Sequence, residues 1–201
     1  MESKHKNALI GALLAVVFVM AVGYAAFAQL LTINGTATID SNWDVHFDPN
    51  QTSSTGVSAI RDGDGTEDPT GTIAYDAANT TATLTASLKQ PGDTVTFTLK
   101  PTNYGNLKAQ AAAAAQIEAG DGETGLTIAS GGQSATKGTN LKWEIVSASR
   151  NVLTGANGGT VAAGNQDTIV VKATFTGGEN EAVVSGQNAK IKIQLNYQQV
   201  A

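Results

Sequence analysis

Residues 81–99 read TATLTASLKQPGDTVTFTL, and this stretch decides the fold class. In both halves apolar and polar side chains alternate with a period of two, which is typical of a strand with one buried face. Between the halves stands Gln90-Pro91-Gly92-Asp93. Proline presets φ and glycine accepts a positive φ, so this tetrapeptide predicts a tight turn. Residues 81–99 therefore predict two strands joined by a turn.

The same alternation recurs on both sides of this stretch, and Asn103-Tyr104-Gly105-Asn106 is expected to end the second strand. Seven or more half-buried strands separated by turns predict an all-β sandwich or jelly roll. Trp43 and Trp143 fall in register with apolar neighbours, so both are expected in the core. The further runs are Leu31–Ile39, Trp43–Phe47, Leu141–Ile145, Ile169–Phe175 and Ile191–Tyr197.

Two segments do not follow the alternation. Residues 48–71 are polar, acidic and rich in glycine. They are too long for a hairpin loop, so we expect a connection that is mobile or folded over the sandwich. Ala109–Ala115 has helical propensity but is short for a helix. It is predicted to form either a strand where only small side chains fit or a short helix on the sandwich.

The first 28 residues have the pattern of a secretory signal. A basic start at Lys4-His5-Lys6 precedes an apolar run from Ala8 to Ala21, and Ala26-Phe27-Ala28 is an A-x-A cleavage motif with Gln29 next. We expect cleavage after Ala28 and a secreted, extracellular protein. The alternative is a retained anchor, because the run approaches the about 20 residues that a spanning helix needs.

Charge and cysteine content limit the partners. Without residues 1–28 the chain keeps 10 Lys and Arg against 16 Asp and Glu, a net charge of −6. Nucleic-acid binding needs a basic surface, so nucleic acid is not an expected partner. There is no cysteine, so neither disulfides nor an N-terminal lipid on cysteine hold this exported chain. Membrane contact is expected only through the uncleaved signal segment.

Catalytic groups are sparse. His46 is the one histidine after the signal, on the polar face of its strand, and no zinc motif occurs. We therefore predict no enzyme activity and no catalytic residues. The acidic group Asp62, Asp64, Glu67 and Asp68 lies on a glycine-containing loop. It lacks the EF-hand spacing, so a solvated loop is expected, with weak calcium binding as the alternative and no other cofactor.

Three N-x-T sequons begin at Asn34, Asn50 and Asn79. In an exported protein they are candidate glycan acceptors. A chain rich in threonine and asparagine also produces such triplets by chance.

Residues 29–40 form the first strand-like segment after the cleavage motif, and Leu30–Ile39 carries no charge. This strand either pairs within its own sheet or adds to the sheet of the next subunit. Head-to-tail addition does not close, so it builds a filament. The side chains that the next subunit would bury are Leu31, Ile33, Ala37 and Ile39.

The stretch Leu84–Phe97, followed by Asn103–Ala109, resembles the TasA/camelysin family of exported fibre-forming proteins. In that family a strand, a Pro-Gly-Asp turn and a second strand precede Asn-x-Gly and a further strand. Gly23-Tyr24-Ala25-Ala26-Phe27 near the cleavage motif and the closing segment Ile191–Tyr197 are similar too. Residues 110–185 lie outside the resemblance.

The resemblance implies a jelly-roll-like antiparallel β-sandwich, preceded by a cleavable signal peptide, that polymerises outside the cell by donor-strand exchange. The product would be a homopolymeric fibre of the biofilm matrix or cell surface. The organisation would be signal peptide 1–28, donor strand 29–40 and sandwich domain 41–201. Two other readings of the sequence are a monomeric extracellular binding or adhesion module and a type IV pilin-like subunit.

Overall fold

The computed structural model describes residues 2–27, 42–48, 50–51, 53–62, 67–155, 164–177 and 187–200. The chain divides into two compact units, Met1–Asp40 and Ser41–Ala201. The donor positions Leu31, Ile33, Ala37 and Ile39 lie outside the described residues.

The first unit contains one long helix, α1, from Glu2 to Phe27. It includes the basic start and the apolar run of the sequence. None of the helices in the described part of the chain combines the length and the apolarity that a membrane crossing requires.

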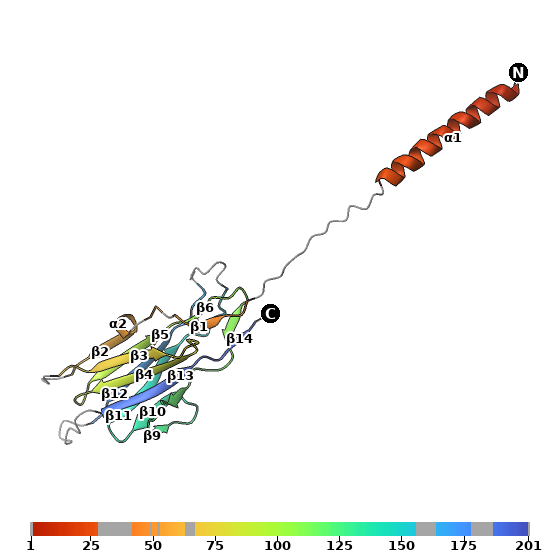
Figure 1. Ribbon diagram of the computed structural model, residues 1–201. Helices are drawn as coiled ribbons and strands as arrows, with labels where there is room; N and C mark the ends of the chain where they lie inside the picture. Colours follow the sequence, from red (N-terminus) through yellow and green to blue (C-terminus); the bar gives the residue numbers. More distant parts are fainter. Residues whose placement is uncertain are drawn as a thin grey trace. The chain divides into compact units, whose positions relative to one another are not determined.

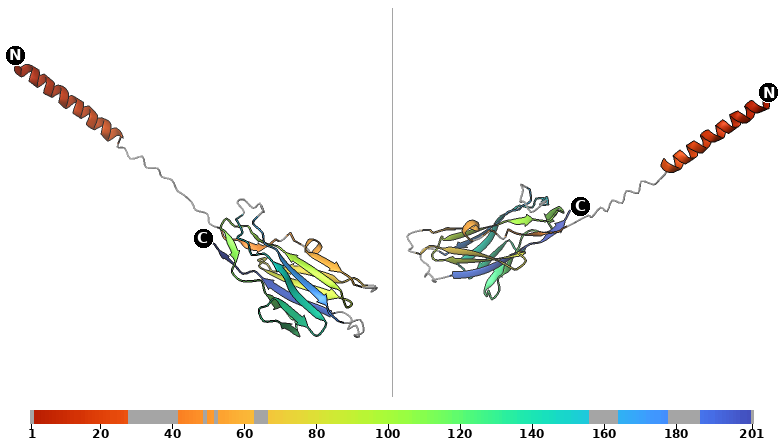
Figure 2. Two further views of the ribbon diagram at one scale, coloured as in Figure 1. Left: turned by 180° about the vertical axis from the view of Figure 1, so that it is seen from behind. Right: turned by 45° about the horizontal axis from the view of Figure 1, so that its top comes forward.

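The second unit is built from antiparallel strands, as the alternation predicted (Figures 1 and 2). One sheet has the order β2-β5-β12-β11-β10-β9, and a second has the order β3-β4-β13-β8. Two short ladders, β1-β6 and β14-β7, lie at the end of the unit that holds the C-terminus. The elements are β1 Val45–Phe47, α2 Ser53–Gly56, β2 Val57–Ile60, β3 Thr70–Tyr75, β4 Thr81–Leu88, β5 Thr94–Leu99, β6 Pro101–Asn103, β7 Ala109–Ala111, β8 Ile117–Ala119, β9 Leu126–Ile128, β10 Ser134–Lys137, β11 Leu141–Ala148, β12 Ile169–Phe175, β13 Gln187–Gln194 and β14 Tyr197–Gln199.

The core lies between the two larger sheets. Every second residue of β4 and β5 is buried, because the period-2 pattern places their apolar side chains on the inner faces. Phe97 of β5 stacks on Trp143 of β11, with ring centroids 5.6 Å apart. Trp143 is fully buried, as its register predicted.

The turn at residues 90–93 joins the two predicted strands, and it also joins the two sheets, since β4 and β5 lie in different sheets. Gly92 has a φ of 91°, a conformation that favours glycine. The Asp93 carboxylate is fully buried and accepts hydrogen bonds from the backbone N–H groups of Lys89, Gln90 and Asp62. The turn is therefore fixed by a buried charge with three donors.

Residues 48–71, expected to form a connection that is mobile or folded over the sandwich, contain a strand and the start of another. Val57–Ile60 forms β2 and pairs with β5 at the edge of the larger sheet, and β3 begins at Thr70. The four residues of β2 are too few to show alternation, and the exposed edge of β5 provides the partner that selects the strand.

Two further expectations change. The helix alternative for Ala109–Ala115 is wrong, because Ala109–Ala111 forms β7 and pairs with β14. Trp43 does not reach the core: its side chain is 40% exposed, since β1 begins only at Val45 and the inward alternation is established only there.

Candidate functional site: a gap between the sheets

Within the described ranges of the chain, one end of β11 has no strand along one of its backbone edges. β11 pairs with β12 along its length, with an irregularity between Ile145 and Ser147, but it pairs with β10 only as far as Glu144. The Ile145 N–H still donates to the Gln133 carbonyl at 2.9 Å. Beyond it, among the residues that the structure describes, no strand pairs with the free edge of Val146–Ala148.

Residues 111–115, here called the alanine segment, lie near the end of β11 and line a hollow together with residues 148–150. The flanking strands β7 and β8 pair with β14 and β13, and residues 112–116 lie opposite residues 194–196. The alanine segment therefore bulges out of the ladder by two residues. Within that bulge the Ala112 N–H donates to the Asn196 carbonyl at 2.8 Å.

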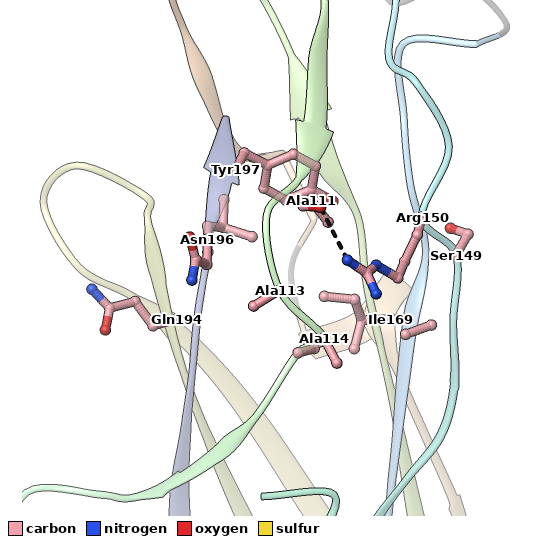
Figure 3. A pocket seen from close by; sticks show the side chains of 12 residues that line it. Ala111, Ala113, Ala114, Ser149, Arg150, Ile169, Gln194, Asn196 and Tyr197 are labelled. Atoms are coloured by element: carbon pink, nitrogen blue, oxygen red, sulfur yellow. Dashed lines mark hydrogen bonds between the residues drawn. The ribbon is translucent and has the colours of Figure 1, made fainter. Parts of the chain in front are cut away.

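The space between residues 148–150 and the alanine segment, here called the seam, is a small hollow that opens to solvent. Its cavity volume is about 20 Å³, which is room for about one water molecule. Figure 3 shows Ala113 and Ala114 beside the segment that carries Arg150. Because its walls are mostly apolar, the hollow offers a surface against which further apolar side chains can pack. Its aliphatic lining consists of Ala111, Ala113, Ala114, Ala115, Ala148, Ile169 and Leu195.

Two side chains bridge the seam. At one end the Arg150 guanidinium donates to the Ala111 carbonyl at 3.2 Å. At the other end the Gln133 amide donates to the Ala115 carbonyl at 2.6 Å. Both carbonyls belong to the alanine segment, so side chains satisfy backbone acceptors that a neighbouring strand would otherwise use.

The seam carries one positive side chain. Among the described residues that line the hollow, Arg150 is the one with a charge. Glu118 lines a neighbouring hollow that shares Ala113 and Ala114 with the first. The seam itself is thus positive at the Ala111 end, where Arg150 lies.

β14 is held beside the seam by a buried polar network. The Tyr197 hydroxyl donates to Asp167 at 2.8 Å, and Asp167 also accepts from the backbone and side-chain nitrogens of Asn151, both at 3.1 Å. Burial, followed by the hydrogen bond to Asp167, raises the pKa of Tyr197 above its ordinary value. Tyr197 therefore stays protonated and acts as a donor.

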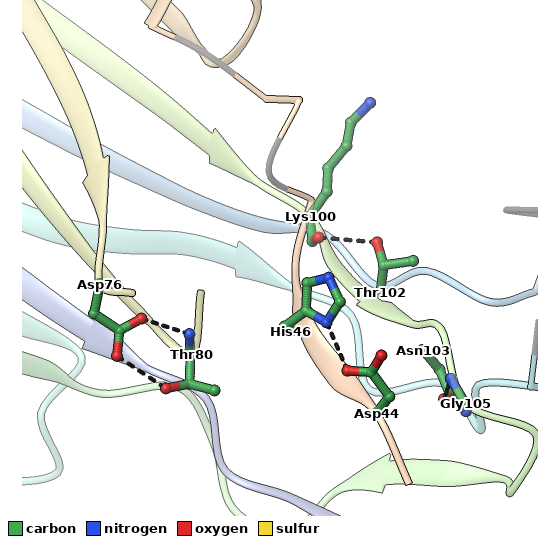
Figure 4. A network of polar contacts seen from close by, with 8 residues as sticks. All are labelled: Asp44, His46, Asp76, Thr80, Lys100, Thr102, Asn103 and Gly105. Atoms are coloured by element: carbon green, nitrogen blue, oxygen red, sulfur yellow. Dashed lines mark hydrogen bonds and ion pairs between the residues drawn. The ribbon is translucent and has the colours of Figure 1, made fainter. Parts of the chain in front are cut away.

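The start of the domain is docked on β6 (Figure 4). The Asp44 carbonyl accepts hydrogen bonds from the N–H groups of Tyr104 at 2.7 Å and Gly105 at 3.2 Å. A Cβ at Gly105 would lie 2.3 Å from the Asn42 carbonyl oxygen, which explains the glycine of the Asn-x-Gly motif. His46 Nδ1 lies 2.7 Å from Asp44 Oδ1, and the ring stacks on Tyr104 at 4.2 Å. The His46 side chain thus helps to hold β1 beside β6.

Figure 4 also shows Asp76, which closes the turn between β3 and β4. Burial opposes ionisation of this carboxyl, but hydrogen bonds from Thr80 and Thr81 outweigh it and lower the pKa of Asp76. Asn79, the third sequon asparagine, lies in this turn with a φ of 54°. Asn50 is exposed, and Asn34 lies outside the described residues.

The acidic residues proposed as weak calcium ligands have other contacts. Asp68 pairs with Arg61 at 3.2 Å, and Glu67 pairs with Lys89 at 3.1 Å. The Asp62 N–H donates to Asp93, and Asp64 lies outside the described residues. In the described part of the chain no three His, Cys, Asp or Glu residues gather as a metal site.

The remaining predicted positions are those of the cleavage motif. Ala26 lies in the last turn of α1, and Ala28 and Gln29 lie outside the described residues. Sequence reasoning did not identify the seam. Its one signal is the run Ala111–Ala115, which is ambiguous for secondary structure because it leaves the ladder between two short strands. No protein-family model, curated protein or solved structure matches this chain.

Proposed function

We propose that this protein is a secreted structural subunit that polymerises into extracellular biofilm-matrix or pilus-like fibres by head-to-tail donor-strand complementation. Residues 29–40 of one copy add as a strand to the seam of the next copy. The observation that carries the proposal is the free backbone edge of Val146–Ala148 beside an apolar hollow. Strand addition satisfies such an edge and fills such a hollow in one step.

The donor and the seam are chemically matched. Leu31, Ile33, Ala37 and Ile39 alternate with polar residues, so an added strand turns one apolar face toward the hollow. The alanine side chains of the lining are short and contribute little apolar area of their own. Burying one large aliphatic side chain contributes about 1.5 to 3 kcal/mol. Burial of a few such side chains offsets the conformational entropy that the donor loses when it becomes ordered.

Each copy has one donor and one seam, so the contact is heterologous and repeats without closing. Export follows from the signal-like residues 1–28, and cleavage after Ala28 would free the donor. The jelly-roll connection is supported by the strand pairing, because the successive strands β4 and β5 pair with the later successive strands β13 and β12.

The test fills the hollow. We expect residues 29–201 to form filaments visible by electron microscopy, and a chain lacking residues 29–39 to remain monomeric. Ala148→Leu should prevent assembly, because the new side chain occupies donor space. Ala74→Leu is the matched control, since Ala74 is an exposed alanine on β3 of the other sheet.

Two outcomes count against the proposal. If residues 29–201 stay monomeric across salt, pH and concentration, the fibre function is wrong. If Ala148→Leu assembles like the control, the seam is not the acceptor. Thermal unfolding of both variants checks that each is folded.

A second function, a monomeric extracellular module that binds glycans, is favoured by one observation. Trp43 is 40% exposed and so is accessible for stacking on a sugar ring. Titration of residues 41–201, the domain without the donor, with oligosaccharides tests this function, with tryptophan fluorescence as the readout. A response that Trp43→Ala abolishes would support it, and an unchanged spectrum would exclude Trp43 as the ligand platform.

A further inference from the structure

We infer that Arg150 forms an ion pair with Asp40 of the incoming copy and so determines the direction in which the donor lies along the seam. The inference rests on the proposed function and names the residues that orient the second copy. It follows from the charges of the donor, the charges of the seam and the hydrogen bond that Arg150 makes in the free subunit.

The donor carries a single charged side chain. Residues 29–39 have none, and Asp40 ends the segment. The α-amino group that cleavage frees at Gln29 is positive and lies at the opposite end of the donor. An uncharged strand enters an apolar hollow without leaving an ion unpaired, but a carboxylate buried without a partner is strongly unfavourable. Asp40 therefore has to lie at an end of the seam, and the two ends are not equivalent for it.

The cation of the seam lies at one end. Arg150 lines the hollow beside Ala111, and it is the one charged residue among the described residues that line it. An Asp40 carboxylate at the Ala111 end is attracted to the guanidinium, whereas at the Ala115 end it meets no cation of the lining. This difference specifies the orientation of the donor.

Arg150 has to change partners for this contact. In the free subunit its guanidinium donates to the Ala111 carbonyl at 3.2 Å, an exposed hydrogen bond. Such a bond is worth little net stability in water. A carboxylate makes a stronger, charge-assisted contact with guanidinium, and the released Ala111 carbonyl can accept from the backbone of the added strand. Arg150 thus bonds to the Ala111 carbonyl in the free subunit, and the donor takes over this contact on assembly.

The test is a charge-reversal cycle in the chain of residues 29–201. We expect Arg150→Glu and Asp40→Lys each to raise the critical concentration for assembly by roughly three- to tenfold, in line with a partly exposed ion pair turned into a repulsion. The double variant should return to within about twofold of the parent. Added salt should reduce the effect of each single reversal.

Lys108→Glu is the matched control, because it makes the same charge change at an exposed residue just before β7. It should leave the critical concentration nearly unchanged. If the parent forms filaments but the double variant does not recover, the Arg150–Asp40 pair is refuted while the fibre function stands. If the parent itself forms no filaments, the proposed function fails. Circular dichroism confirms that each variant is folded.

Discussion

At the scale of single residues, buried charges with several donors hold the turns and loops in place. Asp93 accepts from three backbone N–H groups at 2.8 to 3.1 Å and so ties the turn between the sheets to residue 62. Glu123 acts in a similar way. Its carboxylate pairs with Lys137 at 2.6 Å and accepts from the Lys190 N–H at 2.8 Å.

Asp93→Ala should lower the free energy of unfolding by about 2 to 4 kcal/mol, because three buried backbone donors lose a charged acceptor. Urea denaturation measures the change. Asp68→Ala removes an exposed carboxylate that pairs with Arg61 and should cost less than about 1 kcal/mol. Equal losses in the two variants would show that the turn does not depend on Asp93.

Glu123 predicts a dependence of stability on acid. Burial opposes its ionisation, but the contacts with Lys137 and Lys190 outweigh it and lower the pKa of Glu123 below the ordinary 4.5. A carboxyl with a lowered folded-state pKa stabilises the fold above its unfolded pKa and loses this contribution as the pH falls through the folded value.

Glu123→Gln should therefore be less stable than the parent by about 1 to 2 kcal/mol at pH 6. The difference should shrink as the pH falls below 4.5. Chemical denaturation at pH 6 and pH 3 measures it. A difference that stays constant over this range would contradict the assigned role of the carboxylate.

At the scale of elements, the seam exists because two ladders stop early. β10 ends its pairing with β11 at Glu144, and the alanine segment leaves the ladder between β7 and β8. The short β14 borders the hollow and is secured through Tyr197 and Asp167. Loss of the Tyr197–Asp167 hydrogen bond should therefore loosen the structure mainly around the seam.

Tyr197→Phe should destabilise the domain by about 1 to 2 kcal/mol and increase amide exchange in β7 and β14 more than in β4, because buried Asp167 loses a donor. Tyr75→Phe is the matched control. The Tyr75 hydroxyl is also buried, but among the described residues it has no hydrogen-bond partner. Similar effects of the two substitutions would contradict the role of the Asp167 contact.

At the scale of the whole molecule, each copy has two binding elements in the proposed fibre. Residues 29–40 are the donor, and the seam is the acceptor. Ser41–Ala201 forms a compact unit of its own that contains the whole seam. A chain without the donor can therefore accept a strand but cannot pass one on, and it should terminate a growing fibre.

Residues 41–201, added at about one tenth of the concentration of residues 29–201, should shorten the filaments, with length distributions measured by electron microscopy. Residues 41–201 with Ala148→Leu should leave filament length unchanged, because the leucine side chain occupies the seam. If the two chains without the donor act alike, shortening does not arise from occupation of the seam.

The sequence by itself determined which residues lie inside. The alternation in β4, β5 and β12 predicted the buried faces, because side chains on a strand point to opposite sides with a period of two. Pro91 and Gly92 predicted the turn between β4 and β5, since their allowed φ angles are local properties. The ion pairs of Asp68 with Arg61 and of Glu67 with Lys89 were not predicted from the sequence.

Only the tertiary structure decided how strands are shared between the sheets. β4 and β5 look like a hairpin in the sequence but lie in different sheets, β2 is selected by the open edge of β5, and Trp43 falls outside the inward alternation. The seam belongs to this class as well. Its edge and its hollow come from where pairing between distant segments stops, and no local pattern of residues encodes that end point.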